Sequence, residues 1–308
     1  MSDALAKRAS AAGMAPATQM ASKPQAANAG RLREAARAFC RNIPAVVGLV
    51  LCVMIVAAAI AGPWLYAVEP FDTVAAPLMA PGEEGAPLLG TDYLGRDLLA
   101  GLIHGARATL LVGVLATLVA MGLGVVVGAL SGYYGGRVDR MLMRLTEFFQ
   151  VMPPVLLAMV LIILLKPTLL VQAAAIGAAS WTSAARLTRG EFLRIRHLDY
   201  VAAARTMGAT DGYLIWRVIL PAALPPLVIS ATLTIGAAIL FESGLSFLGL
   251  SNQNVMSWGL MIGGNRPYML DAWWATTMPG IAIFVAVLAI SLVGDGLNEA
   301  LNPRLRER

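Results

Sequence analysis

The amino-acid sequence predicts an all-α membrane protein with about six membrane-spanning helices, and two observations lead to this fold class. The 308 residues are 58% hydrophobic and only 13% charged, whereas a soluble domain has roughly 25% charged residues. Each of six long segments has about the 18 or more residues needed to cross a hydrocarbon core of roughly 30 Å, and backbone in lipid must pair with itself, as it does in a helix. These segments contain no Asp, Glu, Lys or Arg and cover residues 43–68, 108–136, 148–165, 167–185, 218–241 and 272–294.

The first uncharged segment, residues 43–68, predicts a retained membrane helix and not a cleaved secretory signal. Ala59, Ile60 and Ala61 do resemble a cleavage site. Signal peptides, however, have a short basic start and an apolar core of about 7–15 residues, whereas here a 42-residue lead-in precedes an apolar run of more than 20. The lead-in, residues 1–42, is basic and starts with a stretch rich in Ala, Ser, Gln, Met and Pro, so we expect a disordered tail.

The positions of the basic residues predict the orientation of the chain. Of the 23 Lys and Arg residues, seven precede position 43, three lie in 137–144, six in 186–217 and three in 304–308. These segments fall on one side of the membrane if the helices alternate, and basic residues favour the cytoplasmic side. Both termini are therefore expected in the cytoplasm, with 304–308 as a short tail. Residues 69–107 fall on the opposite side, and their acidic sequence with Pro and Gly predicts an irregular periplasmic loop.

The five other predicted helices lie within residues 108–303. The first of them has four glycines at a spacing of four on one face, which predicts the close approach of another helix. These glycines are Gly124, Gly128, Gly132 and Gly136. Residues 243–265 are also uncharged, but their Ser, Asn, Gln and Gly content predicts a loop or a re-entrant stretch and not a spanning helix.

Several classes of function lack the residues that they need. Cys40 and Cys52 lie 12 positions apart, and His104 and His197 have no Cys or His at ligand spacing, so neither a disulfide framework nor a metal site is predicted. The sequence has no His-Glu-x-x-His, Gly-x-Ser-x-Gly or phosphate-loop motif, and we predict no catalytic residue and no enzyme. Because the basic residues gather at helix ends, the net charge of +5 does not indicate nucleic acid.

The longest cytoplasmic segment, residues 186–217, contains the start and stop signals of a short helix. Asp199 is a good N-cap residue, and residues 200–207 form a strong helix-forming run. Gly208 follows at the position where a left-handed residue, usually glycine, ends a helix. The sequence therefore predicts a helix of two turns that projects from the membrane domain, a shape suited to a groove on a soluble partner.

A second start signal follows directly. Thr210 and Asp211 predict the beginning of another helix that ends at about Leu220, and Pro221 then opens the next spanning segment. The short helix is thus expected to lie between two tight bends.

Residues 200–221 resemble the coupling-loop signature of ABC importer permeases, in which a Glu-Ala-Ala run precedes a Gly and an Ile-x-Leu-Pro run follows it. Ala203, Ala204, Gly208, Leu220 and Pro221 match this pattern, with Val218 in the Ile position. The departure is Ala202, which stands where the family usually has Glu and would remove a charged contact to the ATPase. The resemblance implies that an ATPase-coupling region is formed by Tyr200, Ala202, Ala203, Ala204, Arg205, Gly208, Asp211, Leu220 and Pro221.

Five further motifs, in order and at matching spacing, resemble the C-type permease of the dipeptide, oligopeptide and nickel group, and the resemblance covers roughly residues 40–303. The motifs are Gly-Thr-Asp-Tyr-Leu-Gly-Arg-Asp at 90–97, Gly-Tyr-Tyr-Gly-Gly-Arg-Val-Asp at 132–139, Leu-Ser-Phe-Leu-Gly-Leu at 245–250, Ser-Trp-Gly at 257–259 and Gly-Asp-Gly-Leu at 294–297. The resemblance implies a type I, MetI-like importer fold in the bacterial inner membrane, with residues 108–303 as the permease core.

The same resemblance implies a set of partners. These are a homologous second permease, two cytoplasmic ATPases and a periplasmic solute-binding protein, besides the membrane lipid. This chain would bind no cofactor, because ATP and Mg²⁺ would be used by the ATPases. Short peptides are the expected solute, and nickel chelates and glutathione-like solutes remain alternatives.

An ion-coupled secondary carrier is the other class of transporter to consider. Such a carrier needs ionisable groups near its spans, and Glu147, Glu242 and Asp295 are the few available. An acid inside the membrane indicates function by default. Glu242 is therefore a candidate pathway residue that could meet a peptide amino group, or else a partner for Ser243 at a helix end.

Overall fold

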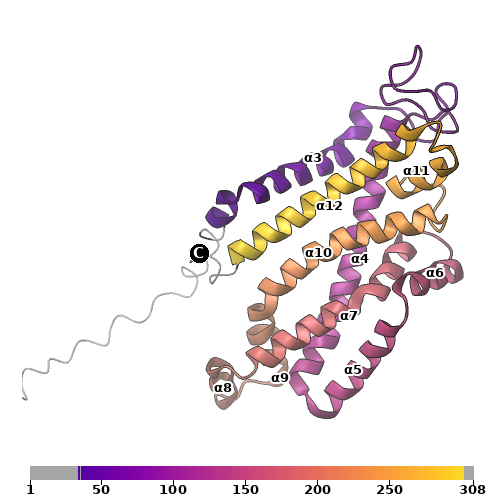
Figure 1. Ribbon diagram of the computed structural model, residues 1–308. Helices are drawn as coiled ribbons and strands as arrows, with labels where there is room; N and C mark the ends of the chain where they lie inside the picture. Colours follow the sequence, from indigo (N-terminus) through magenta and orange to yellow (C-terminus); the bar gives the residue numbers. More distant parts are fainter. Residues whose placement is uncertain (1–33, 35, 302–308) are drawn as a thin grey trace, which may run out of the picture.

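The computed structural model describes residues 34 and 36–301 of the chain, and this part is built from helices (Figure 1). Most of the predicted basic tail 1–42 and all of the predicted tail 304–308 lie outside the described residues. The elements in chain order are α3 (Ile43–Leu65), α4 (Leu98–Tyr134), α5 (Gly136–Val151), α6 (Pro154–Leu165), α7 (Leu169–Ile195), α8 (Asp199–Thr206), α9 (Asp211–Tyr213), the π-helical η1 (Leu214–Ile219), α10 (Leu220–Phe247), α11 (Trp258–Asn265), the 3₁₀ turn η2 (Arg266–Tyr268) and α12 (Trp273–Leu301).

Four helices of the described chain are long and apolar enough to cross a membrane: α3, α4, the continuous helix Asp211–Phe247 and α12. The pair α5 and α6 makes a fifth if it counts as one span, although the two helices meet at an angle of 87°. The predicted single helix at 148–165 is therefore wrong. Helix α5 ends at Val151 because Pro153 and Pro154 follow, and a residue before proline avoids the helical conformation.

Other predicted boundaries differ by less. Helix α4 begins at Leu98, ten residues before the uncharged segment, because the Asp97 carboxylate caps it by accepting from the backbone N–H of Leu99 at 2.7 Å. The fourth uncharged segment lies in α7, which has 27 residues but carries charged side chains over its last third. Residues 243–265 hold the end of α10, a loop and the short helix α11, as their polar content indicated.

Helices α4 and α7 pack in close contact along the glycine face of α4. A Cβ added to Gly128 would lie 2.3 Å from the carbonyl oxygen of Ala185, and one added to Gly124 would lie 2.4 Å from the Ala184 Cβ. Gly132 meets the same helix at Phe192. The predicted packing face is thus confirmed for three of its four glycines, whereas Gly136 opens α5 with a φ of +55°.

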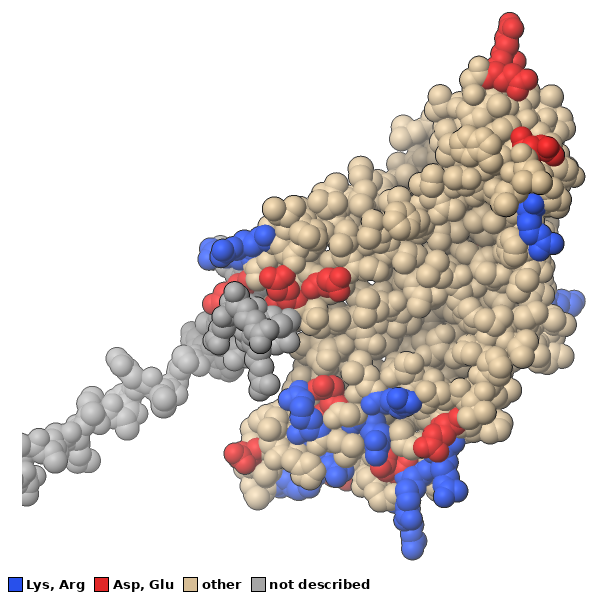
Figure 2. Space-filling view, viewed as in Figure 1, with Lys and Arg blue, Asp and Glu red and all other residues tan. Residues whose placement is uncertain are grey.

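The two ends of the molecule differ in charge. Most Lys and Arg on this face gather at the end that carries α8 and the beginning of α5, with some acidic side chains among them, whereas acidic side chains mark the opposite end, on the loop that precedes α4 (Figure 2). The surface between them is almost free of charge (Figure 2). The start of α3 and the end of α12 lie side by side, where the Asn42 amide donates a hydrogen bond to the Glu299 carboxylate. This arrangement matches the orientation predicted from the basic residues.

The predicted loop 69–107 is irregular only as far as residue 97, because residues 98–107 belong to α4. Hydrogen bonds of the 90–97 motif give the loop 66–97 a defined shape. The Asp92 carboxylate accepts from the backbone N–H groups of Leu94 and Arg96, each at 2.8 Å. Burial raises the pKa of the Asp92 carboxyl, and these two N–H groups oppose the rise. The Tyr93 N–H donates to the Asn265 side chain at 3.1 Å, which fixes the loop to the end of α11.

Candidate functional site

The short helix predicted on the cytoplasmic side is present as α8. It ends in a Schellman turn: the Gly208 N–H donates to the Arg205 carbonyl at 3.0 Å, and the Ala209 N–H donates to the Ala204 carbonyl at 3.1 Å. Gly208 has a φ of +87°, as its predicted role requires. The predicted start is one residue off, because Leu198 is the N-cap and Asp199 is the first helical residue, where its charge suits the helix dipole.

One face of α8 is anchored and the other is exposed. Val201 is buried among Phe192 of α7 and Leu214 of η1, and Ala204 packs against the same apolar cluster. The outward face is composed of small, apolar and basic side chains that this chain leaves exposed. They are Tyr200, Ala202, Ala203, Arg205 and Met207, the last with 81% of its surface exposed.

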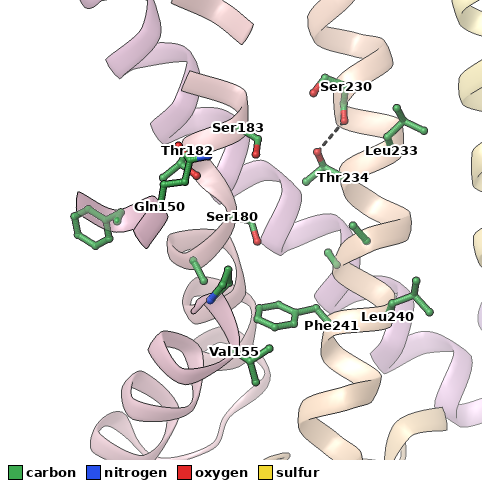
Figure 3. Close-up of a pocket in the computed structure, with 15 residues that line it drawn as sticks. Gln150, Val155, Ser180, Thr182, Ser183, Ser230, Leu233, Thr234, Leu240 and Phe241 are labelled. Carbon is green, nitrogen blue, oxygen red and sulfur yellow. Dashed lines mark hydrogen bonds between the residues drawn. The ribbon is translucent and has the colours of Figure 1, made fainter. Parts of the chain in front are cut away.

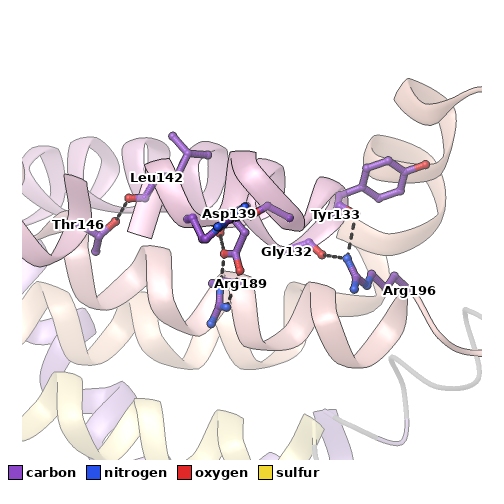
Figure 4. Close-up of polar contacts among 10 residues, drawn as sticks. Gly132, Tyr133, Asp139, Leu142, Thr146, Arg189 and Arg196 are labelled. Atoms are coloured by element: carbon purple, nitrogen blue, oxygen red, sulfur yellow. Dashed lines mark hydrogen bonds and ion pairs between the residues drawn. The ribbon is translucent and has the colours of Figure 1, made fainter. Parts of the chain in front are cut away.

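Polar contacts join this short helix to the end of α4. The Tyr133 hydroxyl donates to the Asp211 carboxylate at 2.6 Å and accepts from the Arg205 guanidinium at 3.3 Å. Arg196, at the end of α7, donates to the carbonyl groups of Gly132 and Tyr133 at 3.0 and 3.1 Å (Figure 4). The bonds of Arg196 satisfy carbonyls that the end of α4 leaves open, and the bond from Arg205 to the Tyr133 hydroxyl joins α8 to α4.

The second predicted start signal is confirmed, but the predicted break at Pro221 is wrong. The Thr210 side chain caps α9 by accepting from the Tyr213 N–H. The helix then continues through the π segment η1 into α10 without a break. Proline clashes with the carbonyl four residues before it, and the wider π turn, in which the Leu220 N–H bonds to the Ile215 carbonyl, accommodates Pro221.

An ion pair that the sequence did not reveal joins α5 to α7 near the same end. Both oxygens of Asp139 accept from Arg189, at 2.6 and 2.7 Å (Figure 4). Ser131 of α4 also donates to Asp139. The two residues lie 50 positions apart, and only the resemblance of residues 132–139 to a family motif pointed to Asp139.

A groove of about 800 Å³ lies between α7, α10 and the junction of α5 with α6. Its hydroxyl groups come from two facing helices, and apolar side chains such as Phe241 fill the rest of the wall (Figure 3). The hydroxyl-bearing residues are Ser180, Thr182, Ser183, Ser230 and Thr234. Sequence reasoning did not find these residues, because it could not orient the helices.

Glu242 lies deep inside the chain, with 1% of its surface exposed. The Ser246 hydroxyl donates to its carboxylate at 2.6 Å, and Ser243 lies 3.4 Å from the other oxygen. Gln172 of α7 donates in turn to Ser246 at 3.3 Å. Glu242 does not line the groove between α7 and α10, so its role in the solute pathway stays a prediction.

Similarity to known proteins decides the family. Residues 124–307 match the family described as binding-protein-dependent transport system inner membrane component, and residues 30–81 match the N-terminal transmembrane domain of oligopeptide transport permease C. The chain belongs to this permease family. Membership confirms the predicted importer permease of the bacterial inner membrane, a membrane component that is not itself an enzyme, and it implies a partnering permease and ATPase subunits.

Relatives of this permease span nearly its whole length. It is 37% identical over 292 residues to the di/tripeptide transport system permease protein DppC of Pseudomonas aeruginosa, covering 93% of this chain and 96% of the relative. It is 36% identical to the dipeptide transport system permease protein DppC of Bacillus subtilis, covering 89% and 86%. A probable D,D-dipeptide transport system permease protein of Escherichia coli is also 36% identical, covering 84% and 87%.

The fold is that of a solved importer. A chain of the MetNI methionine ABC transporter, determined in inward-facing conformations, superposes with a TM-score of 0.51, covering 66% of this permease and 96% of that chain. The two sequences are 21% identical, so the likeness concerns the fold alone. It confirms the type I, MetI-like fold predicted from the sequence.

Proposed function

We propose that this permease forms one half of a pathway through which short peptides, dipeptides above all, enter the cytoplasm. The observation that supports this proposal is the hydroxyl-lined groove between α7 and α10. Its volume of about 800 Å³ falls in the roughly 300–1,000 Å³ range of sites for small ligands. Hydroxyl groups can donate to and accept from peptide groups in turn, which suits a solute that must be passed on and not held.

A homologous second permease would close the open side of the groove. Two cytoplasmic ATPases would receive the outward face of α8 and hydrolyse ATP with Mg²⁺, and a periplasmic solute-binding protein would deliver the peptide. The names of the relatives support peptides as the solute. Nickel chelates and glutathione-like solutes are the alternatives. Membership in a binding-protein-dependent transport family argues against an ion-coupled carrier, the other class of transporter that the sequence alone left open.

The mechanism requires two states of the pathway. Closure of the ATPases on ATP would move α8, and the bonds of Tyr133 and the continuous helix through η1 would pass that movement to α4 and α10. A ligand shifts such an equilibrium only by binding one state better than the other. ATP and the loaded binding protein would both favour the outward-facing state, and hydrolysis would return the pathway to the inward-facing state.

Two measurements test this function. First, the tagged permease is solubilised gently and its companions are identified by mass spectrometry; recovery of a second permease and of phosphate-loop ATPases is expected. Second, the complete transporter is produced in cells that lack peptide uptake, and import of labelled Ala-Ala is measured. Competition by unlabelled Ala-Ala but not by nickel–histidine or glutathione is expected, and the reverse order of competition would overturn the peptide assignment.

A further inference from the structure

We propose that Arg186 binds the carboxylate of a solute when the solute leaves the groove for the cytoplasm. Until the solute arrives, Arg186 donates its hydrogen bond to Gln150. The inference rests on the proposed function and adds to it a residue that handles one chemical group of the solute. It follows from a second cavity, of about 540 Å³, between α5 and α7 at the basic end of the molecule.

The two cavities join at one side chain. Gln150 lines both the hydroxyl-lined groove and the second cavity, and Arg186 lines the second cavity. On α7, Ser180, Ser183 and Arg186 follow one another at a spacing of three, so the hydroxyl face of the groove leads directly to the guanidinium. Arg186 is also the first charged residue after the uncharged segment 167–185. It is therefore the first cation that a solute moving along this face of α7 meets.

The partner of Arg186 is a weak one. The Arg186 Nη1 donates to the Oε1 of Gln150 at 2.7 Å, and both side chains are exposed on this chain. A carboxylate accepts from a guanidinium through two parallel bonds and brings a negative charge of its own, whereas the Gln150 amide offers one neutral acceptor oxygen. A solute carboxylate can therefore displace Gln150, whereas Gln150 can return once the solute has left.

The neighbouring arginine cannot take this role. Arg189, one turn further along α7, donates through its Nε and Nη2 to the two oxygens of Asp139, at 2.6 and 2.7 Å. A solute would have to break this bidentate ion pair first. Arg140 and Arg144 of α5 also line the cavity, together with Glu147 of the same helix. Neither arginine has a bidentate partner among the hydrogen bonds of the described residues, and their charge favours an anion in the cavity.

The test compares two substitutions that a purely structural contact would distinguish. Arg186→Gln removes the guanidinium, and Gln150→Glu gives Arg186 a permanent carboxylate. If the two residues only hold α5 to α7, Gln150→Glu strengthens the contact and leaves import intact. If Arg186 receives the solute, both variants lower the maximal rate of Ala-Ala import at least about fivefold, since Arg186→Gln removes the guanidinium and Gln150→Glu keeps it occupied by a carboxylate of the chain itself.

The matched control is Arg194→Gln. Arg194 lies on the same helix and carries the same charge, but it pairs with Glu191 at 2.6 Å outside both cavities. All variants are assayed in the complete transporter, with co-purification of the partner permease and ATPases as the measure of assembly and with the binding protein unchanged. We expect normal assembly in all three, and import within twofold of the wild type for Arg194→Gln alone.

The possible failures are distinguishable. Import at the wild-type rate by either Gln150→Glu or Arg186→Gln overturns the inference and leaves the proposed function in place. Loss of assembly in Arg186→Gln together with normal import in Gln150→Glu assigns the contact a structural role and also overturns it. Failure of the wild-type transporter to import any peptide overturns the proposed function, and this inference with it.

Discussion

The Tyr133 hydroxyl, at the last turn of α4, joins the end of α8 to the start of α9: it donates to Asp211 at 2.6 Å and accepts from Arg205 at 3.3 Å. Asp211 begins the helix that becomes α10, and Arg205 lies in the last turn of α8. One phenol thus connects the helix proposed to meet the ATPase with two helices of the membrane domain.

Tyr133→Phe is expected to weaken this connection without removing the ring. The loss of two hydrogen bonds at one hydroxyl should destabilise the region by about 0.5–1.5 kcal/mol per bond. We expect ATP hydrolysis by the assembled transporter to continue while peptide import falls, so that more ATP is used per peptide. Tyr134→Phe, next to it on an exposed side chain, is the control, and an unchanged ratio of ATP to peptide in Tyr133→Phe would contradict the prediction.

Gly208→Val should uncouple transport without preventing membrane insertion. No atom lies within 4 Å of a Cβ at this position, so the substitution meets no steric clash. The left-handed backbone at φ +87° is the obstacle, and it costs a β-branched residue roughly 1–2 kcal/mol. Gly212→Ala, with equal space and no positive φ, is the control. Normal import by Gly208→Val, measured with labelled peptide, would show that the Schellman turn is dispensable.

Ala202→Glu restores the residue that the family pattern has at this position. Ala202 is exposed on α8, so a Glu side chain fits, and its charge lies in the first half of a helix, where it suits the dipole. Import is expected to stay equal or to rise slightly. Ala203→Glu places the same charge one position further, where the pattern has Ala, and should lower import. A complete loss of import in Ala202→Glu would mean that the alanine is required.

Gly128→Ala should destabilise the membrane domain. The added methyl would lie 2.3 Å from the Ala185 carbonyl and 2.6 Å from the Thr188 Cβ, and overpacking of this kind costs about 1–3 kcal/mol. Gly122→Ala lies on the same helix with nothing within 4 Å and should be neutral. The thermal midpoint of the detergent-solubilised transporter measures both, and equal midpoints for the two variants would contradict the close contact of α4 with α7.

Substitutions of Glu242 separate a structural role from contact with the solute. Because Ser246 donates to its carboxylate, Glu242→Ala should leave a buried donor without an acceptor, at about 1–3 kcal/mol. Glu242→Gln keeps an acceptor and should retain both the thermal midpoint and peptide import. If Glu242→Gln keeps the thermal midpoint but strongly lowers import, the result would instead support a charged contact between Glu242 and the peptide amino group.

Local chemistry determined what could be predicted from the sequence. The end of α8 at Gly208 and the start of α9 at Thr210 depend on residues within a few positions, and both were predicted. The four-residue glycine spacing also predicted the packing face of α4. Pro153 and Pro154 could have predicted the break in 148–165. The segment was defined only by the absence of charged residues, however, and that criterion does not take proline into account.

The rest depends on how helices are rotated against one another. Asp139 and Arg189 are 50 positions apart and meet only because α5 turns back at Gly135 and Gly136. Ser180 and Ser230 face one groove only because α7 and α10 present those sides to each other. A single sequence shows the periodicity of each helix but not the angle at which that helix faces its neighbour. The residues that line the groove could therefore not be predicted.

The π segment η1 has a geometric consequence for the length of the chain between α9 and α10. A π turn takes in one residue more than an α turn, and each residue of an α-helix corresponds to 100° of rotation and 1.5 Å of rise. If one residue between Leu214 and Ile219 were absent, the π turn would close as an α turn and Ser230 and Thr234 would keep their direction relative to α9, whereas the loss of one residue from the α-helical part that follows would turn them by about 100°. The direction in which Ser230 and Thr234 face is therefore a matter of helical phase as well as of distance, and η1 is the stretch of this long helix that accommodates the loss of one residue with the least change of phase.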